Sequence, residues 1–178
     1  MGKGSTFEVI LPSKPPDLES TGEPETRLSL DVDSNLRSIS EAVSPLSGVR
    51  ALVVDDDQDS REMLNAALMA YGGEVRTCAS SSEALKTLEE WMPDVLVSDI
   101  GMPNEDGYSL IERIRKPPSN RGGNIPALAL TGYATLDDHK QALAAGYQMH
   151  MAKPIELRKL AATVTSLIDG NRSARARS

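Results

Sequence analysis

The stretch "LVVDDDQDS", residues 52–60, passes directly from three apolar residues into Asp55, Asp56 and Asp57. Its apolar part belongs to the run "RALVV", residues 50–54, which is typical of a strand buried on both faces of a parallel sheet. Carboxylates gathered at the end of such a strand repel one another, which raises the pKa of one of them unless a cation relieves the repulsion. The stretch therefore predicts a parallel sheet with a charged site at its edge.

Apolar runs alternate with amphipathic stretches along the chain from residue 49 onward. We expect five strands, at residues 50–54, 74–78, 94–98, 126–130 and 147–151. We expect five helices, at residues 61–71, 82–91, 107–115, 136–145 and 156–168, and Gly170 is expected to end the last of them. Strict alternation with right-handed crossovers predicts an α/β fold with a doubly wound five-stranded parallel sheet, (βα)5.

The composition indicates one domain with extensions, because 178 residues with 39% hydrophobic content can bury one good core. The formal charge of -7 argues against sequence-independent binding to nucleic acid, which depends on Lys and Arg. Cys78 is the single cysteine, which excludes an internal disulfide and a cysteine-rich zinc site. No apolar run approaches the roughly 18 residues of a membrane helix, and the start lacks the apolar region of a signal peptide. We therefore expect a cytoplasmic chain that makes no membrane contact.

The segment before the expected sheet has the composition of a linker. Residues 12–48 contain five of the eleven prolines and no aromatic residue. Such a segment has too little apolar surface to offset the entropy that it would lose on ordering. We therefore expect a disordered N-terminal extension, with a largely disordered linker over residues 13–48.

Four of the expected strands lead into charged or hydroxyl side chains at the edge where a doubly wound sheet binds its ligands. The first strand is followed by Asp55 and Asp56, and the third by Asp99. The fourth is followed by Thr131, and Lys153 comes just after the fifth. Singly these residues have ordinary explanations, since Asp often caps a helix and Lys-Pro often forms a solvated turn. Their coincidence at matched strand ends favours one common site.

The residue types in this set suit metal-assisted chemistry at phosphorus. Carboxylate oxygens are hard ligands that fit Mg2+, and the ion relieves their mutual repulsion. One carboxylate can then attack phosphorus, while the metal and the ammonium group of Lys153 neutralise charge that builds on the phosphoryl oxygens. We therefore expect the acidic cluster to hold Mg2+.

Four motifs in this order resemble the response-regulator receiver domain of two-component systems. They are "LVVDDDQDSRE", "DVLVSDIGMPNEDGYSLIERIR", "IPALALTGYA" and "AGYQMHMAKPIE". The resemblance covers about residues 49–170 and implies a flavodoxin-like fold. It also implies a phosphoacceptor signalling domain rather than an enzyme, with a histidine kinase or a histidine phosphotransfer protein as its partner.

The resemblance assigns roles residue by residue. Asp99 corresponds to the phosphoacceptor and Lys153 to the residue that contacts the phosphoryl group. Asp56 corresponds to a direct metal ligand and Asp55 to a ligand that acts through water. The backbone carbonyl of Gly101 would complete the protein's part of the metal shell. Met102, Pro103 and Gly107 match the loop that shapes this site, and Asp57 and Asp59 are expected to be a helix cap and a first-turn charge.

The switch residues implied by the resemblance depart from the family pattern. Thr131 is the hydroxyl expected to move to the phosphoryl group, and an aromatic ring normally follows that movement. His150 stands at the position of the ring, where the family usually has Tyr or Phe. Gly101 offers no side chain to orient an attacking water, and Tyr133 can shield the site, so we expect a long-lived phosphorylated form.

The first residues carry a second resemblance. "GKGSTFEVILP", residues 2–12, is similar to the closing strand of a histidine-kinase ATP-binding domain. It implies a kinase remnant at residues 1–12, a receiver at 49–170, a short basic tail at 171–178, and an origin in the C-terminal part of a hybrid histidine kinase. The kinase catalytic core would be absent from this chain. A Gly/Ser-rich start followed by an unrelated short strand remains the alternative.

Other functional classes match parts of the acidic stretch. Asp55-x-Asp57 has the signature of haloacid-dehalogenase phosphatases, which also need a later acidic pair, and the candidate pair is Asp137-Asp138. A calcium loop that starts at Asp55 fails, because Ser60 and Ala66 stand where Gly and Glu are needed. A receiver-like interaction module that is not phosphorylated would be expected to have lost Asp99 or Lys153.

Overall fold

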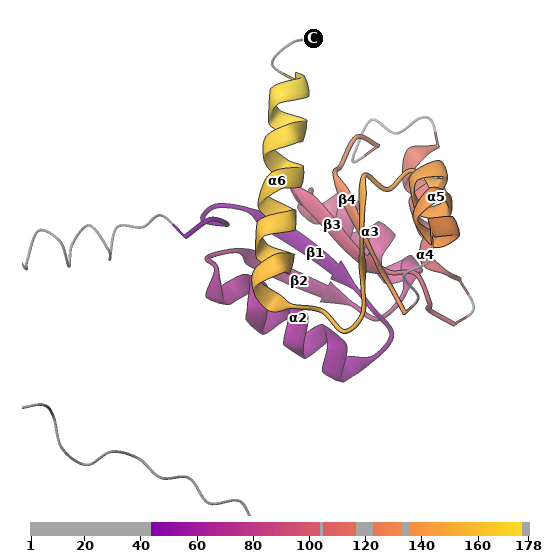
Figure 1. Ribbon diagram of the computed structural model, residues 1–178, viewed down its shortest axis with the longest axis horizontal. Coiled ribbons are helices and arrows are strands. Elements are labelled where there is room, and N and C mark those ends of the chain that lie inside the picture. The colour runs from indigo at the N-terminus through magenta and orange to yellow at the C-terminus, as the bar shows by residue number, and fades with distance from the viewer. Residues whose placement is uncertain (1–43, 104, 117–122, 133–135, 176–178) are drawn as a thin grey trace, which may run out of the picture. The chain divides into compact units, whose positions relative to one another are not determined.

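The computed structural model describes residues 44–175 apart from 104, 117–122 and 133–135 (Figure 1). Strands and helices alternate along this part of the chain in the predicted order. The strands are β1 (Arg50–Val54), β2 (Glu74–Cys78), β3 (Val95–Asp99), β4 (Ala127–Thr131) and β5 (Met149–Ala152). The helices are α2 (Gln58–Ala70), α3 (Ser81–Trp91), α4 (Gly107–Arg115), α5 (Leu136–Ala145) and α6 (Leu157–Arg175). The expected kinase remnant and most of the linker lie outside the described residues.

The five strands form one sheet in the order β2-β1-β3-β4-β5, and every pair is parallel. The order reverses at β1, which lies between β2 and β3. This arrangement confirms the prediction of a doubly wound parallel sheet. In the register, Val54 pairs with Ser98 and Thr131 pairs with Ala152. The carboxyl ends of β1, β3, β4 and β5 therefore lie along one edge, and that edge positions the site.

A hydrophobic cluster covers each face of the sheet. On one face, α2 and α6 pack their buried leucines and valines against Val53 and Val97. On the other, residues of α3, α4 and α5 pack against Leu52 and Leu96. Successive strand residues point to opposite faces, so a strand with helices on both sides is apolar throughout, as the first motif predicted. All four of these strand residues are fully buried.

The structure moves the predicted ends of three elements by two residues or more. α2 begins three residues earlier than expected, because Asp57 caps it by accepting a hydrogen bond from the backbone N of Ser60 at 2.8 Å. β5 begins two residues later than expected, since the fully buried Tyr147 precedes it and donates its hydroxyl to the carbonyl of Gly107 at 2.8 Å. Gly170 does not end α6, which continues to Arg175. A glycine weakens a helix, but it ends one only where the backbone turns left-handed.

The packed core begins before residue 49. Leu46 is fully buried in the cluster beneath α2 and α6, and its backbone N donates to the carbonyl of Tyr71 at 3.0 Å. This contact anchors the turn at residues 44–47 against the end of α2. Among the described residues, no helix has both the length and the apolar character needed to cross a membrane.

Candidate functional site

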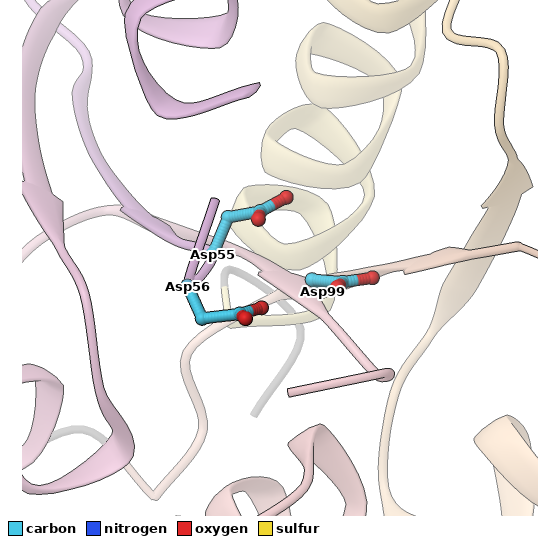
Figure 2. Close-up of side chains that lie close together, drawn as sticks. All are labelled: Asp55, Asp56 and Asp99. Carbon is cyan, nitrogen blue, oxygen red and sulfur yellow. The ribbon is translucent and has the colours of Figure 1, made fainter. Parts of the chain in front are cut away.

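Three carboxylates meet at the edge of the sheet. Asp55 and Asp56 follow β1, and Asp99 is the last residue of the neighbouring strand β3. Figure 2 shows the three side chains extending toward the same side, and one carboxylate oxygen from each lies within 4.8 Å of the others. Asp55 is fully buried, Asp99 is 7% exposed, and Asp56 is exposed. The group is thus held by the protein on one side and open to solvent on the other.

Lys153 joins two of these carboxylates. Its Nζ lies 2.9 Å from Oδ2 of Asp55 and 3.3 Å from Oδ1 of Asp99. Its backbone N donates to the carbonyl of Thr131 at 2.7 Å, which fixes the residue beside the end of β4. Partial burial lowers the pKa of Lys153, but the hydrogen bond to Asp55 and the charge of Asp99 outweigh that effect and raise it. The side chain therefore remains an ammonium ion at neutral pH.

The backbone of the acidic turn is held by a residue that the sequence did not single out. The Arg61 guanidinium donates to the carbonyl oxygens of Asp55 and Asp56 at 2.8 and 2.9 Å. The backbone N of Asp57 donates to Oδ1 of Asp55 at 3.0 Å, which orients that carboxylate. Asp57 itself is the helix cap, as predicted, and its hydrogen bonds with Ser60 lower its pKa. The sequence signal for this contact was an arginine at the fourth position of α2, one turn after the acidic residues.

The loop after β3 shapes the open side of the site. Gly101 is exposed, and a Cβ at this position would lie 3.6 Å from Oδ2 of Asp99. Gly107 starts α4 and has no such room, because a Cβ there would collide with the backbone O of Asp99 and lie 2.9 Å from Cα of Ile100. The first turn of α4 is consequently packed directly against the end of β3. Met102 is buried in the cluster beneath this loop.

Thr131 and His150, the two proposed switch residues, lie on neighbouring strands. Thr131 ends β4 and is 6% exposed. His150 is half-buried on β5 and pairs with Ala129, two residues before Thr131. Tyr133, which we expected to shield the site, lies outside the described residues.

His150 has a partner that sequence reasoning missed. Its Nδ1 lies 2.7 Å from Nδ1 of His139, which is half-buried on α5. Partial burial lowers the pKa of His150, as do the charges of His139 and Lys159, while Asp138 acts in the opposite direction. The sequence signal was only that the two histidines of the chain fall on consecutive elements.

The donor set fits a small divalent cation. Three carboxylate oxygens within 4.8 Å of one another, one of them from an exposed residue, leave room for an ion that keeps part of its water shell. Asp137 and Asp138 do not belong to this cluster, although they are among the described residues. The acidic pair that a haloacid-dehalogenase phosphatase requires is therefore not at the site.

Comparisons with known proteins agree on one family. The family model described as response regulator receiver domain matches residues 51–165. The chain is 36% identical over 123 residues to the transcriptional regulatory protein PrrA of Mycobacterium leprae, covering 69% of this chain and 51% of PrrA. It is 31% identical over 145 residues to the sensor histidine kinase RcsC of Escherichia coli, covering 82% of this chain and 15% of RcsC. The chain thus spans about half of PrrA and a small part of RcsC.

Solved structures give the same result. A putative response regulator from Chloroflexus aurantiacus J-10-fl superposes with a TM-score of 0.64 at 35% identity, covering 68% of this chain and 98% of that chain. A CheY-like response regulator receiver domain protein from Methanospirillum hungatei JF-1 has a TM-score of 0.64 at 27% identity, covering 72% and 98%. Nearly the whole of each of these chains corresponds to the fold described above.

Proposed function

Because the chain belongs to the response regulator receiver domain family, we propose that it takes a phosphoryl group from a phosphohistidine onto Asp99. Receiver domains of this family are phosphoacceptor modules of two-component signalling and are not catalytic enzymes. The observation that carries the assignment is the ammonium group of Lys153, which lies between Asp55 and Asp99 at 2.9 and 3.3 Å.

Asp99 is the best placed of the three carboxylates to act as the nucleophile. Asp55 is fully buried and already accepts hydrogen bonds from the backbone N of Asp57 and from Lys153. Asp56 is exposed, and the ion pairs that Lys153 forms with the described residues are to Asp55 and Asp99 instead. Asp99 combines contact with Lys153 through Oδ1 and an open approach past Gly101 on the side of Oδ2. In the transfer, an oxygen of Asp99 bonds to phosphorus and the bond from phosphorus to the imidazole nitrogen breaks. The donor imidazole carries a proton on its other ring nitrogen, so it leaves as a neutral histidine.

Family members use Mg2+ at an acidic site, and we propose that this chain does so with Asp55, Asp56, Asp99 and the backbone carbonyl of Gly101. The ion, when bound, would neutralise charge on the phosphoryl oxygens. The protein's own contribution is positioning. Arg61 and the cap at Asp57 hold the acidic turn, and Lys153 supplies a second positive charge.

Thr131 and His150 are proposed to transmit the phosphorylated state. A charge-assisted hydrogen bond from the Thr131 hydroxyl to a phosphoryl oxygen is stronger than a neutral one, which favours movement of the hydroxyl toward the site. His150 would respond because β5 pairs directly with β4. His150 is also hydrogen-bonded to His139 on α5, so a movement of His150 would act on α5 as well.

We further propose a histidine kinase or a histidine phosphotransfer protein as the partner, and an origin in the C-terminal part of a hybrid histidine kinase. The match to RcsC is longer than residues 49–178, so it includes part of the segment before the receiver. A hybrid signal transduction histidine kinase D from Dictyostelium discoideum also matches, at 28% identity over 130 residues. We propose residues 1–12 as a kinase remnant, 13–48 as a linker, 49–170 as the receiver and 171–178 as a tail, in a cytoplasmic protein that binds no nucleic acid.

The test is phosphorylation by a small-molecule donor. With Mg2+ and acetyl phosphate, the intact mass of the chain should increase by one phosphoryl group, and excess chelator should prevent the increase. Asp99→Asn should abolish it because the amide is not a nucleophile. Asp59→Asn is the matched control, since Asp59 lies in the first turn of α2 and not in the carboxylate cluster. A mass gain that persists in Asp99→Asn would show that the phosphoacceptor is another residue.

A further inference from the structure

The two histidines of the chain lie side by side although their positions in the sequence differ by eleven. Their Nδ1 atoms lie 2.7 Å apart, and their rings are 4.4 Å apart between centroids and tilted by 47°. A hydrogen bond at this distance requires a proton on one Nδ1 and a lone pair on the other. Two nitrogen donors from separate elements, α5 and β5, are thus already aimed at each other from half-buried positions.

We propose that His139 and His150 together bind one divalent transition-metal ion, Zn2+, Cu2+ or Ni2+, through their Nδ1 atoms. Imidazole nitrogen suits these metals, whereas the carboxylate cluster at the sheet edge suits Mg2+. The site is distinct from that cluster, because neither histidine belongs to the group formed by Asp55, Asp56 and Asp99. It would bind a different class of cation and would fix α5 against β5.

The geometry requires only a small adjustment. Two Zn–N bonds of about 2.0–2.1 Å at a tetrahedral angle place the nitrogen atoms about 3.3 Å apart. The observed 2.7 Å therefore has to open by about 0.6 Å, which modest rotation of two partly exposed rings can supply. The proton on one Nδ1 moves through solvent to Nε2 of the same ring. Both rings then carry Nε2–H and coordinate through Nδ1, and the neutral pair releases no net proton.

Two charged side chains act on the histidine pair, and the negative one, Asp138, acts on His150 more strongly than the positive one, Lys159. Asp138 precedes His139 on α5, and its negative charge acts on both His150 and Tyr108 of α4. Lys159 of α6 acts on His150 in the opposite sense. Partial burial and the charge of His139 lower the pKa of His150, which favours the neutral form of its ring. Water molecules would complete the coordination on the exposed side.

The test is a Zn2+ titration of the full chain without a histidine tag, in excess Mg2+ so that the carboxylate cluster is occupied. We expect calorimetry to give one Zn2+ per chain. We also expect nitrogen-15 NMR to show both Nδ1 resonances shifting with Zn2+, and the chain has no other histidine to confuse the assignment. His139→Gln and His150→Gln should each weaken binding at least tenfold. Lys140→Gln, an exposed neighbour on α5, should bind Zn2+ like the unchanged chain.

Two results would overturn the proposal. One is Zn2+ affinity that is the same in the double variant His139→Gln/His150→Gln as in the unchanged chain. The other is an absence of any Nδ1 shift in the unchanged chain, which would leave the pair as a hydrogen bond only. This second measurement does not depend on whether a variant folds. Neither result depends on phosphorylation of Asp99, so the proposed function stands or fails separately.

Discussion

At the scale of single residues, the absence of a side chain at Gly101 leaves one side of Asp99 open. A Cβ placed on Gly101 would lie 3.6 Å from Oδ2 of Asp99, so a longer side chain at this position reaches the space that a hydrolytic water must occupy. With glycine, no side chain from this position can hold the water in line for attack. The slow loss of the phosphoryl group expected from the sequence remains a prediction, and it rests on the missing side chain at Gly101.

We predict that Gly101→Asn shortens the lifetime of the phosphorylated form severalfold, because the amide can hold a water near the phosphoryl group. The chain would be phosphorylated with acetyl phosphate, freed of donor, and followed by intact mass over time. Gly101→Ala fills the position without a polar group and should leave the decay rate close to that of the unchanged chain. Equal decay of the Asn and Ala variants would contradict the role given to a side chain here.

The lowered pKa of His150 predicts that the stability of the fold depends on pH. Its pKa in the folded chain is lowered, first by burial and then by the charge of His139, so the unfolded chain binds the proton more readily. The free energy of unfolding contributed by this group is complete above the ordinary pKa of His, near 6.5, and is lost as the pH falls below it.

We predict that acidification from pH 7.5 to pH 5 lowers the free energy of unfolding more in the unchanged chain than in His150→Gln. Urea unfolding with a chelator present measures both, and the chelator removes any contribution from bound metal. Protonation of the carboxylates affects the two chains alike. The difference between their changes in free energy of unfolding therefore reports on His150. A pH dependence that is identical in both chains would mean that His150 does not differ between the folded and unfolded states.

At the scale of elements, two helical glycines have opposite roles. Gly107 opens α4 where a Cβ would meet backbone atoms of Asp99 and Ile100, so only glycine allows α4 to pack against the end of β3. Gly170 lies inside α6 with nothing within 4 Å of the position of a Cβ. The first glycine is required by packing, and the second only adds backbone entropy to the unfolded chain.

We predict that Gly107→Ala lowers the free energy of unfolding by about 1–3 kcal/mol, since it overpacks a site bounded by backbone. Gly170→Ala should raise it by about 0.5–1 kcal/mol, because alanine is the better residue in a helix interior. Chemical denaturation of the two variants side by side provides the measurement. A stabilising effect of Gly107→Ala, or a cost for Gly170→Ala above 1 kcal/mol, would contradict the assigned packing.

At the scale of the whole molecule, the folded unit includes the turn before β1. Leu46 is fully buried between α2 and α6, whereas the domain boundary proposed from sequence begins at residue 49. Pro45, with Ser44 before it and Ser47 shortly after it, gave this turn the composition of the linker, which concealed the burial of Leu46. Hydropathy averaged over a segment does not reveal a single buried side chain.

We predict that Leu46→Ala lowers the free energy of unfolding by about 2–5 kcal/mol, the usual cost of removing a buried leucine side chain. Met69→Ala is the control, since Met69 lies on α2 with 56% of its surface exposed and should change stability by less than about 0.5 kcal/mol. Thermal unfolding of the full chain reports both. If the two variants unfold alike, the turn at residues 44–47 makes no contribution to the folded unit.

The sequence by itself determined the order of the elements, the parallel doubly wound sheet and the meeting of Asp55, Asp56, Asp99 and Lys153. These conclusions depend on local patterns and on a rule of topology, because the carboxyl ends of neighbouring parallel strands must share one edge. The roles given to those residues rest on the resemblance and remain predictions.

The tertiary structure alone decided several further features outside the carboxylate cluster. The contact between His139 and His150, the hydrogen bonds from Arg61 to the acidic turn, the burial of Leu46 and the continuation of α6 past Gly170 belong to this group. Each depends on rotamers, on packing or on helix continuation, for which the sequence carries at most a weak signal. Short-range patterns report which face of an element is buried, but the partner on that face is selected by the folded arrangement.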